Sequence, residues 1–248
     1  VFCKTQMPLN TGINADELPT LFAKYNELST EDKLELLTSF KGHVKKELVD
    51  ASAIELYFRV LLDTDTEIPE SDAVDENSSK LSQLKHSSLC YLIKRVTMQA
   101  PSIFHDSNMV NRIILYLLLH APSDTAPQSL ERKKFWVPSI KAIESVYQIS
   151  SSQVIKCLSG ALEEIPSDGS ISNEKKWQNY RNIVSATIEI TKDSGSSALK
   201  DFLPVIARTL HQDDANESLS KEIQITTELV ADLWITEVKK PSIPIQTV

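Results

Sequence analysis

The chain of 248 residues carries a formal net charge of −8, and its isoelectric point lies near 5.2. Nucleic-acid-binding domains usually present a basic face, so this acidic balance argues against that class of protein. The 5 glycines are too few for an architecture of strands and tight turns, and the 3 cysteines are too few and too scattered for a disulfide framework. Because no signal peptide and no apolar run of about 18 residues is recognised, we expect a protein of the cytoplasm or nucleus without a membrane partner.

Apolar residues recur at the spacing of amphipathic helices along most of the chain, and the predicted helices fall into pairs. The first pair covers residues 16–25 and 32–47, with an N-capping arrangement just before the second helix. The second pair contains the apolar runs at 54–62 and 89–96, which a long loop, Asp63–Ser79, separates. This loop holds seven acidic side chains and no basic one, so we expect a solvated insertion.

The third and fourth pairs follow the same pattern. Pair three contains the apolar stripes at 110–118 and 136–147. The prolines in the segment Pro122–Pro127 end the first helix of this pair. Pair four contains the stripes at 154–165 and 180–187. The first helix of pair three is apolar on so many sides that we expect it to be central.

A fifth pair, at 199–210 and 219–233, completes the pattern. Helix pairs that repeat in this way are typical of solenoids of the HEAT kind, in which each pair buries one face on its neighbours. The sequence therefore predicts an all-α fold, a right-handed-type helical-repeat array of about five HEAT-like helix pairs. We divide the chain into an N-terminal extension (1–15), a single domain (16–237) and an extended linker (238–248).

Few residues carry the patterns of catalytic or metal sites. His86 and Cys90 share a helix face, but a metal site needs more ligands, so we expect a packed cysteine with a polar neighbour. No glycine-rich phosphate loop is recognised, and no nucleophile stands beside a base. We therefore expect a protein that is not an enzyme, with no cofactor and no metal ion.

The loops inside the pairs are more informative, because in a solenoid they emerge along one edge. Loop three (131–136) and loop four (173–177) both carry a Lys-Lys pair followed by an aromatic residue. Basic residues beside aromatic anchors suit an acidic protein partner. The alternative is that each tryptophan packs on the core and the lysines are only solvated. The predicted contact residues are Lys133, Lys134, Trp136, Lys175, Lys176, Trp177 and Arg181.

Three sequence blocks resemble the repeats of budding-yeast CLASP proteins. They are Phe40–Val49, His86–Val96, and Lys133–Trp136 together with Ser139–Glu144. The resemblance is to the N-terminal TOG-like domain of that family, and it implies a TOG-like α-solenoid in a microtubule-associated protein. It further implies a role in cell division at the mitotic spindle, kinetochore and cytoskeleton, with αβ-tubulin bound through the loops along one edge.

The first loop departs from the pattern of tubulin-binding TOG domains, which usually place a tryptophan and then a basic residue there. Residues 28–33 contain no tryptophan and two acids. The leading hypothesis is therefore a monomeric, non-catalytic module that recognises another protein, such as a kinetochore or spindle component. The alternative is direct αβ-tubulin binding by the same loops, with Lys33 and Lys221 at the flanks. A further alternative is an unrelated HEAT scaffold or adaptor.

Overall fold

The computed structural model describes residues 13–46, 49–63, 76–119, 132–165, 172–191 and 228. Within these residues the regular elements are helices, without a strand, which confirms the predicted all-α class. The main helices are α1 (Leu18–Ala23), α2 (Thr30–Lys46), α3 (Ile54–Leu61), α4 (Glu76–Gln99), α5 (Ser107–Leu119), α6 (Val137–Glu164) and α7 (Asn173–Thr191). In the described part of the chain, no helix combines the length and the apolar character that a membrane span requires.

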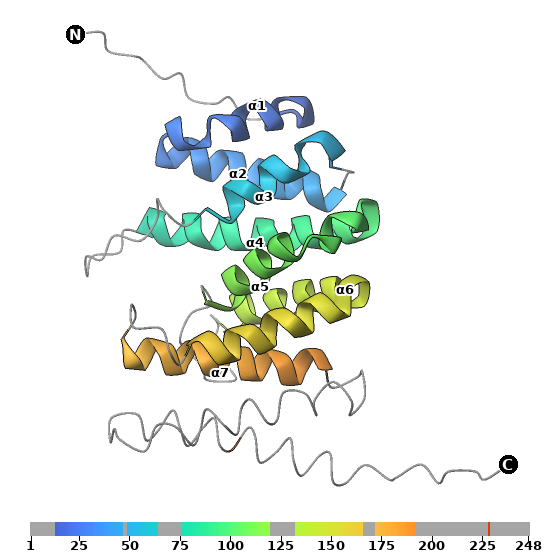
Figure 1. The fold of residues 1–248 in the computed structure, drawn as a ribbon. Helices are drawn as coiled ribbons and strands as arrows, with labels where there is room; N and C mark the ends of the chain where they lie inside the picture. The colour runs from blue at the N-terminus through green and yellow to red at the C-terminus, as the bar shows by residue number, and fades with distance from the viewer. Residues whose placement is uncertain are drawn as a thin grey trace, which may run out of the picture.

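The helices form a stack in which each pair packs on the next (Figure 1). One row runs from α2 through α4 to α6 and α7, and α1 packs on α3, α3 on α4, and α5 on α6 and α7. This arrangement confirms a helical-repeat array. Apart from residue 228, the fifth predicted pair (199–233) lies outside the described residues, as does the linker at 238–248.

The start of α2 illustrates how the sequence sets a helix boundary. The Ser29 hydroxyl accepts the backbone N–H of Asp32 at 3.1 Å and donates to its carboxylate at 2.8 Å. This is the N-capping arrangement that the sequence predicted, and it satisfies one of the unpaired N–H groups at the helix start. Two acidic residues, Glu31 and Asp32, stand in the first turn, where the helix dipole favours negative charge.

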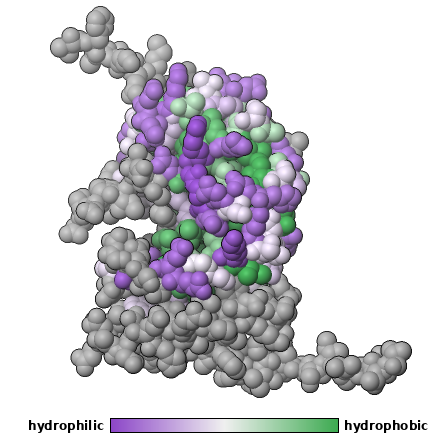
Figure 2. All heavy atoms as spheres, viewed as in Figure 1, coloured by the Kyte–Doolittle hydropathy of each residue, from purple (hydrophilic) through white to green (hydrophobic). Residues whose placement is uncertain are grey.

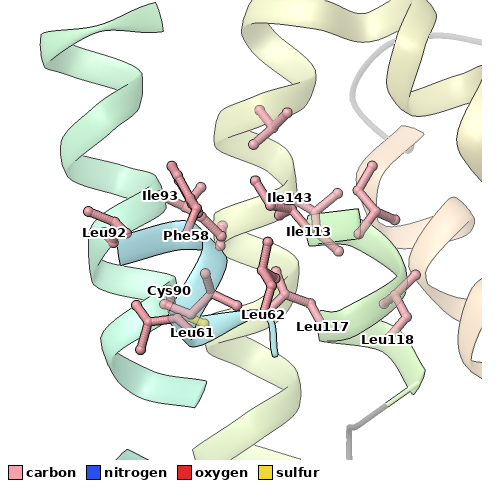
Figure 3. Packing of buried hydrophobic residues seen from close by; sticks show 14 of the residues in the cluster. Phe58, Leu61, Leu62, Cys90, Leu92, Ile93, Ile113, Leu117, Leu118 and Ile143 are labelled. Atoms are coloured by element: carbon pink, nitrogen blue, oxygen red, sulfur yellow. The ribbon is translucent and has the colours of Figure 1, made fainter. Parts of the chain in front are cut away.

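The core is continuous through the described part of the stack. At its N-terminal end, Phe22, Phe40 and Tyr57 place their ring centroids 4.7–4.8 Å apart, so that aromatic contacts join α1, α2 and α3. Further along, apolar side chains of α3, α4, α5 and α6 point toward one another (Figure 3). Figure 2 shows hydrophilic residues over much of the face seen in Figure 1, with hydrophobic residues between them.

Two predicted boundaries shift in the structure. Helix α4 begins at Glu76, so the last four residues of the predicted loop Asp63–Ser79 belong to a helix; there Glu76 pairs with Lys80 at 2.6 Å. Ile13, which the sequence places in the N-terminal extension, is buried, and its carbonyl lies 2.9 Å from His43 Nε2. The packed structure therefore includes residues before position 16.

The second helix of pair three and the first helix of pair four are joined without a loop. They form the single element α6, which bends sharply at Ser150 (φ −137°, ψ 55°). The buried Ser150 hydroxyl donates to the Phe104 carbonyl at 2.7 Å, and Gln153 Nε2 donates to the His105 carbonyl at 2.6 Å. These bonds fix the bend against the short 3₁₀ turn Pro101–His105.

We predict that Ser150→Ala lowers the free energy of unfolding by about 1–3 kcal/mol, because it leaves the Phe104 carbonyl without its hydroxyl donor. Urea denaturation would measure the loss. The control is Ser145→Ala, whose hydroxyl donates to the Lys141 carbonyl of the same helix, and it should change stability by about 0.5 kcal/mol or less. Equal losses in the two variants would contradict a role for Ser150 in holding the bend.

Candidate functional site

The residues of predicted loop three form a π-helical turn, Arg132–Trp136, that leads directly into α6. Lys134 is exposed, whereas the Trp136 side chain is only 5% exposed. Its indole Nε1 donates to Glu189 Oε1 on α7 at 3.1 Å. The tryptophan thus joins two repeats, and the Lys133 side chain lies outside the described part of the structure.

The residues of predicted loop four belong to a helix, which corrects the sequence prediction. Helix α7 begins at Asn173, because Ser172 caps it: the Ser172 hydroxyl accepts the Lys175 N–H at 3.3 Å and its carbonyl accepts the Lys176 N–H at 2.9 Å. Lys175 is exposed and Lys176 is half-buried. Trp177 is 4% exposed and packs edge-on against Tyr180, with ring centroids 5.5 Å apart.

Three of the predicted contact residues are therefore inside the protein. Trp136, Trp177 and Arg181 are each at most 5% exposed, which is the arrangement expected if the tryptophans pack on the core. A partner that approaches this edge meets lysine side chains rather than indole rings. The sequence could not distinguish the two arrangements, because both place an aromatic residue at a helix start.

Of the two lysines predicted at the flanks, the structure describes Lys33. Lys33 is half-buried near the start of α2, and its Nζ lies 5.1 Å from the centroid of the Tyr25 ring. Lys221 lies outside the described residues.

His86 and Cys90 have packing roles, as the sequence predicted for them. Burial raises the pKa of the Cys90 thiol to about 12, so the thiol stays protonated at neutral pH. The Ser139 hydroxyl donates to the Phe135 carbonyl at 2.7 Å, and its oxygen lies 2.8 Å from His86 Nε2. The described residues contain no group of three or more potential metal ligands.

A feature that the sequence did not predict is a groove of about 680 Å³ between α2, α4 and the start of α6. We call it the basic groove. Its basic lining residues are Lys41, Lys80, Lys94, Lys134 and Lys141, and its apolar lining includes Leu34, Leu84, Tyr91, Val137 and Pro138. Among the described residues that line it there is no carboxylate. One local signal was the spacing of Lys80 and Lys94, which are fourteen residues apart and so lie on one face of α4.

Comparison with known proteins identifies relatives of the chain. It is 39% identical over 116 residues to Protein STU1 of Eremothecium gossypii, and 31% identical over 217 residues to Protein STU1 of Kluyveromyces lactis. Both similarities agree with the resemblance to budding-yeast CLASP proteins and support a CLASP-type, microtubule-associated protein. The alignments cover 47% and 83% of this chain, but only 7% and 14% of those relatives. No model of a protein family matches it, and no solved structure matches it significantly.

The burial of Trp136 and Trp177 leads to a prediction about the stability of the protein. Trp136→Ala and Trp177→Ala should each lower the free energy of unfolding by about 3–5 kcal/mol, because each removes a buried aromatic side chain. The double variant Lys134→Glu, Lys175→Glu should change it by about 0.5 kcal/mol or less, because both lysines are exposed. Urea denaturation of the three variants would test this. A large loss in the lysine variant would mean that these side chains pack internally.

Proposed function

We propose that this chain is a non-catalytic, TOG-like protein-recognition module of a microtubule-stabilising protein that acts at the mitotic spindle and kinetochore. The similarity to Protein STU1 of two yeasts supports the association with microtubules and the cytoskeleton. The helical-repeat array supports recognition of a macromolecule, since such arrays offer long surfaces. The partner that we propose is a protein of the kinetochore or spindle.

The observation that carries this proposal is the exposure of basic residues at the starts of successive helices. Helices α2 and α4 run parallel, because Ser88 lies at hydrogen-bond distance from the Leu37 carbonyl while Arg95, further along α4, donates to the Val44 carbonyl. Helices α6 and α7 begin on the same side of the stack as α4 (Figure 1). The exposed Lys134 and Lys175 therefore belong to one edge, the recognition edge, defined by the starts of α6 and α7.

Direct binding of αβ-tubulin is the second candidate. Tubulin is acidic, and lysines at the recognition edge would attract it by long-range electrostatics. The resemblance to TOG domains gives the same edge as the tubulin contact. The two acidic residues of the first loop leave less positive charge at the α2 end of that edge, which favours the first candidate.

Size-exclusion chromatography with light scattering, at low and moderate salt, would separate the two candidates. If tubulin is the partner, the chain and αβ-tubulin should co-elute as a one-to-one complex that weakens with salt, because exposed charges are screened. Lys134→Glu with Lys175→Glu should then reduce complex formation about tenfold or more. Lys46→Glu with Lys156→Glu is the matched control, since both lysines are exposed but neither stands at the start of α6 or α7.

If no tubulin complex forms at low salt, the first candidate, recognition of a kinetochore or spindle protein, remains. It should then be tested with purified kinetochore and spindle proteins and the same two double variants. A partner whose binding is insensitive to Lys134 and Lys175 would contradict the recognition edge.

A further inference from the structure

The basic groove lies on a part of the surface different from the centre of the recognition edge. Lys41 comes from the middle of α2, Lys94 from the second half of α4, and Lys141 from the second turn of α6. Only Lys134 belongs to both surfaces. The groove therefore needs its own explanation, which does not depend on the proposed function.

The floor of the groove exposes apolar side chains that the fold does not cover. Tyr91 is 36% exposed and Val137 is 40% exposed, and both line the groove. They are two of the three large hydrophobic residues that are exposed in the described part of the chain; the third, Met98, follows Tyr91 by seven positions on α4. Leu84 precedes Tyr91 by the same interval, so these residues form a line along one face of α4. Contiguous exposed apolar surface commonly marks an interaction site.

The rim of the groove is positively charged although the chain as a whole is acidic. Five lysines line it, whereas the net charge of the chain is −8. Two cations stand over the floor: Lys45 Nζ lies 4.5 Å and Lys41 Nζ lies 5.9 Å from the centroid of the Tyr91 ring. Lys80 is partly neutralised by Glu76 at 2.6 Å. The positive potential is therefore concentrated around Tyr91, between Lys41, Lys94 and Lys141.

The apolar floor and the positively charged rim of the groove favour one kind of binding partner. A groove between helices with an apolar floor and charged rims fits an amphipathic helix, whose apolar side chains enter the groove and whose polar side chains meet the rims. A volume of about 680 Å³ is enough for several side chains. A nucleic acid fits less well, because the apolar lining is mainly aliphatic (Leu34, Leu84, Val137 and Pro138) and, among the described lining residues, Tyr91 is the single aromatic ring on which a base could stack.

We propose that the basic groove binds an acidic amphipathic helix of a partner protein. Its apolar side chains pack on Tyr91, Val137 and Leu84, and its carboxylates face Lys41, Lys94 and Lys141.

The test uses the whole chain and fluorescein-labelled synthetic helices of about 18 residues, roughly five turns, measured by fluorescence anisotropy. Three acidic probes carry glutamates on one face and leucine, phenylalanine or methionine on the other. Two matched probes replace either the glutamates by lysines or the apolar residues by alanines. We expect at least one acidic probe to bind with an affinity that falls as salt is raised, and neither matched probe to bind.

Two variants locate the binding. Lys94→Glu with Lys141→Glu should weaken the acidic probe about tenfold or more, because both lysines are exposed on the rim and neither belongs to the recognition edge. Tyr91→Ala should weaken the same probe while its salt dependence stays unchanged. The control Lys46→Glu with Lys156→Glu should bind like the unaltered chain. Circular dichroism and thermal denaturation establish that each variant is folded.

Several outcomes would overturn the proposal. One is that none of the three acidic probes binds; another is that the groove variants bind as tightly as the control. A third is that a single-stranded DNA oligonucleotide displaces the bound probe at lower concentration than the unlabelled peptide, which would assign the groove to nucleic acid. None of these results bears on binding at Lys134 and Lys175, so the proposed function would be judged separately.

Discussion

Helix α4 is the element on which the rest of the described structure depends. Its buried face, including Leu89, Leu92, Ile93 and Val96, is fully covered. Packing of that face against α2, α3 and α6 removes apolar surface from water along the whole helix, which is the main force that holds a repeat array together. Because each pair is stable only on its neighbours, loss of this central contact would uncouple the first repeat from the third.

Polar side chains of α4 fix how its neighbours meet it. Arg95 donates to the carbonyls of Val44 at 3.0 Å and Lys45 at 2.9 Å, which are among the unpaired groups at the end of α2. The buried Lys85 donates to the Asp63 carbonyl just beyond α3, and Gln99 exchanges hydrogen bonds with the backbone of Val49. Because the carbonyls at a helix end have few possible hydrogen-bond donors, these bonds fix the position of the neighbouring helices along α4. Apolar packing alone would define that position less closely.

The two opposite faces of α4 serve different purposes, one stability and the other recognition. One face supplies the core, and the opposite face presents Tyr91 and Lys94 in the basic groove. The recognition edge and the groove share Lys134, so a partner at one surface would change the electrostatic potential at the other. A chain of net charge −8 that gathers lysines in two places would favour acidic partners there and repel them elsewhere.

The sequence by itself determined the helices and their pairing. The apolar spacing placed α1, α2, α3 and α5 within a few residues, whereas α4 and α7 begin well before the predicted stripes. The Ser29 cap was evident and Cys90 was correctly expected to be packed, because each of these features depends on residues close together in the chain. Three sequence blocks were enough to show the resemblance to budding-yeast CLASP proteins. Tertiary structure alone decided which side chains in and before the first turns of α6 and α7 are covered by their neighbours, and so it buried Trp136, Trp177 and, further along α7, Arg181. It also created the basic groove, because Lys41, Lys94 and Lys141 are about fifty residues apart in sequence and meet only when three helices pack side by side.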